Sequence, residues 1–115
     1  MATLGELEQR VMDVLWAADG PMSVRQVLEV LLDDKRLAYT TVMTVLDRLA
    51  KKDVVSRERD GRQWMYTPAR DRASLVVDHI ETLVGTDAET RRAVFAELVQ
   101  RYPELELNGA ATGAE

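Results

Sequence analysis

The chain has 115 residues, no cysteine and a net charge of −5, and 46% of its residues are hydrophobic. This composition suits one small folded domain with a core of its own. The lack of cysteine excludes disulfide bonds and thiolate metal sites. No apolar run approaches the roughly 20 residues of a membrane span, and no secretory signal is visible. We therefore expect a cytoplasmic protein without a membrane partner.

The basic residues gather in the middle of this acidic chain. Between Lys35 and Arg62 there are eight basic and four acidic residues, a net charge of +4, whereas the other residues together carry −9. A basic stripe on one part of a chain is the electrostatic footprint of a nucleic-acid-binding domain.

The first half of the chain shows three helical patterns. Apolar residues recur at helical spacing from about 4 to 18, from 24 to about 32 and from about 39 to 52. Ser23 is a good N-cap for the second helix, whereas Ala38 is a poor one for the third. Three short helices in this region are typical of a helix-turn-helix domain.

Two strand-like segments follow, 54–59 and 62–68, with Asp60-Gly61 between them. Asp-Gly between two such segments is a strong signal for a β-hairpin. Three helices followed by a hairpin describe a winged helix, so the predicted fold is mainly α with a small β hairpin. Base stacking by Trp64 and Tyr66 is conceivable, but we favour a role in anchoring the hairpin to the helices.

Two further helices are predicted, from about 71 to 84 and from about 88 to 101. They carry more apolar residues than a two-helix tail can bury on itself, which favours a dimer interface. The residues expected there are Leu75, Ile80, Leu83, Val94, Phe95 and Leu98. Folding back onto the winged helix within one chain is the alternative. The expected division is a DNA-binding domain over 1–69, a dimerisation region over 70–107 and a disordered tail over 108–115.

The third helix has an apolar side and a polar side. The polar side holds Thr40, Thr44, Asp47, Arg48 and Lys51, with Thr41 and Met43 on its flanks. Short hydroxyls followed by cations suit the major groove, where Thr packs on a thymine methyl and Arg pairs with guanine. An ordinary solvated helix face is the alternative. Asp47 could accept a hydrogen bond from cytosine, although an ion pair with Lys51 is favoured.

The hairpin carries cations near its tip: Arg57, Arg59 and Arg62. Beside a recognition helix, such a wing commonly lies along phosphates or in the minor groove. The alternative is a charged edge that only discourages sheet aggregation.

Several segments resemble the BlaI/MecI/CopY family of bacterial repressors, the penicillinase repressors. The segment 38–49 (AYTTVMTVLDRL) is the most specific match, and 4–8, 11–16, 24–27 and 61–68 also resemble that family. The resemblance implies a homodimer whose winged helix-turn-helix domains bind a dyad-symmetric double-stranded DNA operator and repress transcription.

The resemblance also implies which recognition-helix residues contact DNA: Thr40, Thr41, Met43, Thr44 and Arg48. Met43 stands where relatives often carry a larger polar residue, so an apolar contact to a thymine methyl is expected there.

The chain departs from the family in three ways. Without cysteine it lacks the Cys-x-Cys pairs of the copper-responsive members. The Asn-Phe bond that is cleaved in penicillinase repressors has Glu97-Leu98 as its nearest counterpart. Pro103 and Gly109 interrupt the region where relatives often have another helix. An unidentified inducer or protease is therefore left open.

Other classes of protein fit less well. An enzyme is disfavoured because no nucleophile, acid–base pair or metal cluster is visible, and no cofactor is expected. The only histidine, His79, suits a structural or interface role better than a metal or pH-sensing role. The runner-up is a winged helix that contacts another protein and does not bind DNA sequence-specifically.

Overall fold

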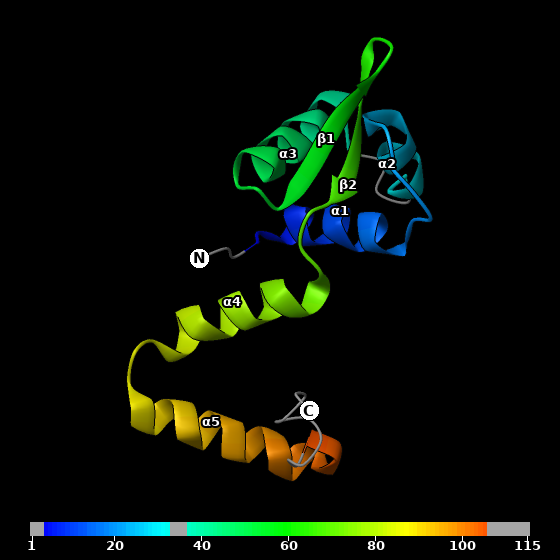
Figure 1. Ribbon diagram of the computed structural model, residues 1–115. Helices are drawn as coiled ribbons and strands as arrows, with labels where there is room; N and C mark the ends of the chain where they lie inside the picture. Colours follow the sequence, from blue (N-terminus) through cyan, green and yellow to red (C-terminus); the bar gives the residue numbers. More distant parts are fainter. Residues whose placement is uncertain (1–3, 33–36, 106–115) are drawn as a thin grey trace. The chain divides into compact units, whose positions relative to one another are not determined.

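The computed structural model describes residues 4–32 and 37–105 (Figure 1). The chain divides into two compact units between His79 and Ile80. In chain order the elements are α1 (Glu6–Ala17), α2 (Val24–Val30), α3 (Tyr39–Lys51), β1 (Val55–Asp60), β2 (Gln63–Pro68), α4 (Arg72–Val84), α5 (Ala88–Arg101) and the 3-10 turn η1 (Pro103–Leu105). The mainly helical fold with one hairpin is confirmed. None of these helices combines the length and apolar character that crossing a membrane would require.

Local capping explains where the first two helices begin. The backbone N–H of Gly5 donates to Glu8 Oε1 at 2.9 Å, before the first turn of α1. Ser23 and Gln26 form a reciprocal capping box at the start of α2, with distances of 2.9 and 3.2 Å, which confirms the predicted N-cap. α2 ends at Val30, two residues before the predicted end.

α3 begins and ends without the most favourable cap residues. Ala38 is its N-cap and makes no side-chain cap hydrogen bond. Beyond the C-cap, Asp53 adopts a left-handed φ of 62°, and the N–H of Val54 donates to the carbonyl of Leu49 at 2.9 Å. This is the hydrogen bond of a Schellman motif, with Asp where glycine is usual.

The hairpin differs from the prediction by one residue at its turn. β1 and β2 are antiparallel, and Asp60 pairs with Gln63, so the two loop residues are Gly61 and Arg62. Gly61 has a φ of 69°, as the first loop position of a type II′ turn requires. The expected Asp60-Gly61 turn is therefore wrong, because cross-strand pairing extends β1 through Asp60.

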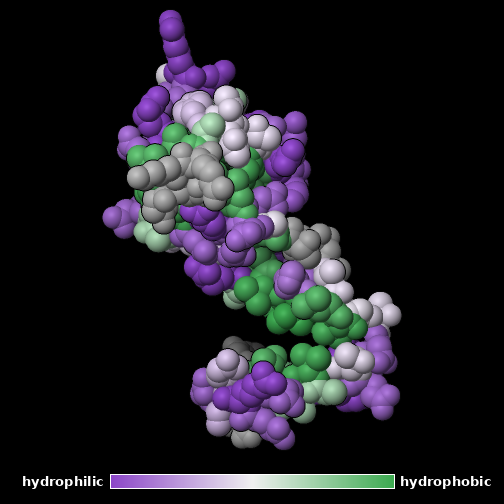
Figure 2. Space-filling model, turned by 180° about the vertical axis from the view of Figure 1, so that it is seen from behind, coloured by the Kyte–Doolittle hydropathy of each residue, from purple (hydrophilic) through white to green (hydrophobic). Residues whose placement is uncertain are grey.

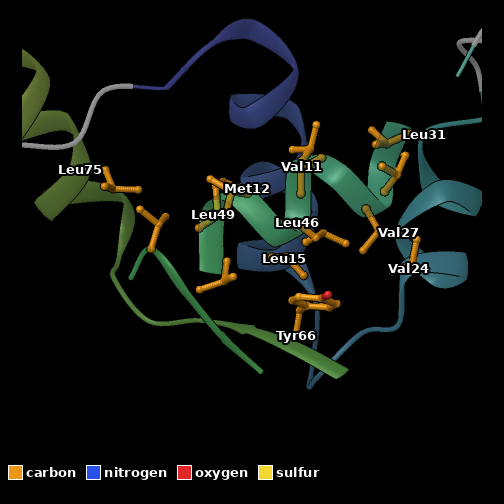
Figure 3. Packing of buried hydrophobic residues seen from close by; sticks show 14 residues of the cluster. Val11, Met12, Leu15, Val24, Val27, Leu31, Leu46, Leu49, Tyr66 and Leu75 are labelled. Carbon is orange, nitrogen blue, oxygen red and sulfur yellow. The ribbon is translucent and has the colours of Figure 1, made fainter. Parts of the chain in front are cut away.

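The core of the first unit lies between α1, α2, α3 and the base of the hairpin. Side chains from these elements point toward one another (Figure 3). The helical patterns predicted for α1 and α3 are confirmed, because Val11, Met12, Leu46 and Leu49 are fully buried. Tyr66 is 1% exposed, and its backbone exchanges two hydrogen bonds with Met22, at 2.8 and 2.9 Å. This pairing fastens β2 to the segment before α2.

The start of α4 belongs to the first unit. Trp16 packs beside the core, and its Nε1–H donates to the carbonyl of Arg70 at 2.9 Å. Leu75 is 4% exposed and belongs to the core. The functional boundary expected near residue 69 stays a prediction.

The second unit comprises the end of α4, α5 and η1. Gly85, with a φ of 72°, ends α4, and Asp87 caps α5 by accepting from the backbone N–H groups of Glu89 and Thr90 at 3.3 and 3.2 Å. No described residue of α5 is buried. Apolar residues gather on the surface of α4 and α5 (Figure 2). The tail expected over 108–115 lies outside the described residues.

Candidate nucleic-acid interface

One face of α3 is exposed along its whole length. Four apolar residues point into the core: Val42, Val45, Leu46 and Leu49. The six predicted recognition residues are all exposed: Thr40, Thr41, Met43, Thr44, Arg48 and Lys51. The hydroxyl of Thr44 donates to the carbonyl of Thr40 at 2.9 Å and keeps its own lone pairs available. The face therefore presents hydroxyls and a methionine toward its start and cations toward its end.

A shallow groove runs along one flank of this face, between α3 and the start of α1. It is lined by Gly5, Leu7, Glu8, Thr40, Thr41, Thr44, Val45 and Arg48. Within it, burial raises the pKa of Glu8, but the Gly5 N–H and the Lys52 ammonium, helped by the charge of Arg48, bring the net pKa below its usual value. Arg48 is therefore close enough to the Glu8 carboxylate to interact with its charge, and the Arg48 side chain stays exposed.

Asp47 connects α3 to the hairpin. Its Oδ2 lies 3.2 Å from Lys51 Nζ, which confirms the predicted ion pair, and its Oδ1 lies 3.1 Å from Arg57 Nη1. Hydrogen bonds from Lys51 and then Arg57 hold the pKa of Asp47 below its usual range. The contact with Arg57 is not foreseen in the sequence, because it depends on how the hairpin packs beside α3.

The wing carries an aromatic ring between two arginines. The guanidinium carbons of Arg57 and Arg59 lie 4.6 and 4.7 Å from the centre of the Trp64 ring. Arg59 also donates to the carbonyl of Arg62 in the turn, at 3.1 Å. Hydrogen bonds with Tyr66 and Asp47 raise the pKa of Arg57 above its usual value.

The two aromatic residues of the wing have different roles. Tyr66 anchors the hairpin in the core, as predicted. Trp64 is 36% exposed and lies outside the core cluster, so the prediction that it packs against the helices is wrong. It stacks on the arginines because it lies near the tip of the hairpin, where β2 has not yet reached the body of the domain.

The fold and this surface define a winged helix-turn-helix DNA-binding protein. Three helices support an exposed polar helix face, and a hairpin with three arginines lies beside it. This is the arrangement in which one helix enters the major groove and the wing reaches the backbone.

The comparisons with known proteins name the family. The model of the penicillinase repressor family matches residues 4–108, and the chain belongs to that family. It is 45% identical over 105 residues to the transcriptional regulator BlaI of two Mycobacterium tuberculosis strains, covering 88% of this chain and 75% of that protein. The resemblance seen in the sequence is thereby confirmed. The chain is a DNA-binding transcriptional repressor and not an enzyme.

Solved structures agree with this assignment. The solution structure of the DNA-binding domain of the repressor BlaI is 28% identical with a TM-score of 0.55, covering 62% of this chain and 85% of that one. Monomeric Bacillus licheniformis BlaI in complex with the blaP half-operator is 28% identical with a TM-score of 0.53, covering 63% and 87%. A RosR complex structure, 19% identical with a TM-score of 0.55 over 90% and 96%, shares the fold.

Proposed function

We propose that this repressor binds a dyad-symmetric operator as a homodimer, with α3 of each chain in the major groove. The observation that carries the proposal is the exposed face of α3, where all six predicted recognition residues are accessible. The half-operator complex of B. licheniformis BlaI supports a half-site for each chain. Occupying a promoter would then exclude RNA polymerase.

The recognition residues divide by chemistry. Thr40 and Thr41 reach phosphates or base edges through their hydroxyls, whereas the Thr44 hydroxyl, which donates to the Thr40 carbonyl, accepts from the amino group of a base. All three can pack a methyl group on thymine. Met43, 41% exposed, makes an apolar contact with a thymine methyl. Arg48 is the candidate for a forked contact to guanine O6 and N7. Lys51 contributes positive charge, which its ion pair with Asp47 partly neutralises.

The wing contributes backbone contacts. Arg59 and Arg62 are exposed near its tip, where phosphates of the adjacent groove would lie. Arg57 is held by Asp47 and Trp64, with its side chain 28% exposed, so its contact with DNA is the most restricted of the three.

The second unit supplies the proposed dimer interface. Leu83 and Phe95 are 75% and 53% exposed, and Ile80, Val94 and Leu98 line an open apolar groove of about 200 Å³. Apolar side chains exposed at this density on two helices mark an interaction surface. Leu75 is left out of the interface, because it is buried in its own chain.

Release from DNA requires something that weakens dimerisation or DNA affinity, which we attribute to an inducer, a protease or a partner protein. Because the relatives are bacterial transcriptional regulators, which meet their DNA in the cytoplasm, the proposed site of action is the cytoplasm.

Fluorescence anisotropy tests the proposal. The purified protein is titrated into a labelled duplex from upstream of its own gene at about 150 mM salt, with a scrambled duplex as control. We expect at least ~10³-fold preference for the native duplex and a stoichiometry of two chains per site. Equal, weak binding to both duplexes, and to a pool of randomised duplexes, would overturn the proposal in favour of a protein-binding winged helix.

A further inference from the structure

An acidic residue lies in the middle of the proposed DNA-facing surface. Asp47 follows Thr40 and Thr44 along the exposed face of α3, at helical spacing, and precedes Lys51. Its side chain is 38% exposed. If α3 enters the major groove as proposed, this carboxylate comes close to the negatively charged duplex, and like charges oppose binding.

Asp47 forms ion pairs with two cations, Lys51 and Arg57. Arg57 contacts one carboxylate oxygen at 3.1 Å and Lys51 contacts the other at 3.2 Å. Arg57 is further restrained by stacking on Trp64 at 4.6 Å. These contacts hold the carboxylate in place and reduce the positive charge that Lys51 and Arg57 offer to phosphates.

The carboxylate keeps its capacity to read a base. Each carboxylate oxygen can accept about two hydrogen bonds, and one cation occupies each of them. The major-groove partner that suits a carboxylate is the exocyclic N4 amino group of cytosine, since both oxygens are acceptors and cytosine presents a donor there.

We propose that Asp47 is a specificity-determining residue that accepts a hydrogen bond from cytosine N4 in the operator and weakens binding to DNA that lacks a donor at that position. The inference rests on the proposed function. Its physical basis is that repulsion from phosphates acts on every duplex, whereas the hydrogen bond to the base acts only on the correct one, so their difference appears as specificity.

The matched variants are Asp47→Ala and Glu58→Ala. Both remove one negative charge near Arg57. Glu58 lies next to Arg57 in β1, and alternate strand residues point to opposite faces of the hairpin. Circular dichroism and thermal melting confirm that both variants fold.

Two measurements use these variants and the wild-type protein. The first is selection of binding sites from a pool of randomised duplexes, which finds the preferred sequence even when the natural operator has not been located. The second is a specificity ratio, the dissociation constant on a scrambled duplex divided by that on the selected duplex, measured by anisotropy at fixed salt.

We expect the wild-type site to contain a cytosine in each half-site whose preference is lost with Asp47→Ala. The ratio for Asp47→Ala should fall about tenfold, because binding to scrambled DNA strengthens while the base contact is lost. Glu58→Ala should still select the cytosine, and its specificity ratio should stay within about twofold of the wild-type value, since general charge effects act equally on both duplexes.

The inference would be overturned if Asp47→Ala still selected sites with the cytosine, or if its specificity ratio matched that of Glu58→Ala. Either result would leave the proposed function intact. If the wild-type protein enriches no sequence at all, the proposed function itself fails. The wild-type selection thus separates the two failures.

Discussion

Lys52, the C-cap of α3, contacts both carboxylate oxygens of Glu8 in the first turn of α1, at 3.0 and 3.2 Å. The two residues are 44 positions apart in the sequence, and the Glu8 side chain is only 14% exposed. The pair therefore links the C-terminal end of α3 to the first turn of α1.

This ion pair predicts an acid-sensitive contribution to stability. The pKa of Glu8 in the folded protein lies below its ordinary value of 4.5, so the stabilisation is complete above that value and is lost as the pH falls through the lower, folded-state pKa. We expect Glu8→Gln to reduce the free energy of unfolding by about 1 kcal/mol at pH 7. Urea denaturation at several pH values should show the difference from wild type shrinking in acid. Glu6→Gln, an exposed residue of the same turn, is the control, and an equal loss there would contradict the prediction.

The hydrogen bond from Trp16 to the Arg70 carbonyl predicts a difference between the two tryptophans. Trp16→Phe leaves a part-buried carbonyl without its 2.9 Å donor, so the free energy of unfolding should fall by about 1–2 kcal/mol. Trp64→Phe keeps an aromatic ring at the exposed wing and should cost under about 0.5 kcal/mol. Chemical denaturation measures both, and similar losses for the two variants would refute this assignment.

Arg48 is expected to read a base. Arg48→Ala should weaken operator binding by about 1–3 kcal/mol and affect a scrambled duplex less. Anisotropy titrations on both duplexes measure the two losses. The same loss on both would reassign Arg48 to a phosphate.

Arg62 is expected to contact a phosphate from the turn of the wing. Arg62→Ala should weaken binding to all sequences by a similar factor. It should also make the negative slope of the logarithm of the association constant against the logarithm of the salt concentration shallower by about one unit. Titrations between about 50 and 200 mM salt determine the slope. A slope that stays at the wild-type value would place the tip of the wing away from DNA.

The second unit is expected to hold the dimer together. Leu83→Glu puts a charge on a residue that is 75% exposed in one chain, and burying an unpaired charge at an interface is unfavourable. Sedimentation equilibrium should show monomers, and operator binding should weaken at least tenfold because one half-site contact is lost. Gln100→Glu, an exposed residue of α5, controls for the added charge. A dimeric Leu83→Glu protein would exclude this surface as the interface.

Most elements could be predicted because their signals are local. α5 spans Ala88–Arg101 as expected, and α3 ends one residue before its predicted limit. The turn of the hairpin could not be located to the residue, since its register depends on pairing between Asp60 and Gln63 across the strands. Local sequence marks a glycine turn, but two neighbouring registers contain Gly61.

By itself the sequence determined which face of α3 is buried and which is exposed, because helical periodicity assigns each residue to a face. Only the tertiary structure decided what the exposed charges contact. The pairing of Asp47 with Arg57, the stacking of Trp64 on two arginines and the bridge between Met22 and Tyr66 all join separate elements. The stacking of Trp64 depends on the register of the two strands, whereas the other two contacts depend on how the hairpin packs against the helical part of the domain, which is set by the shape of the shared core.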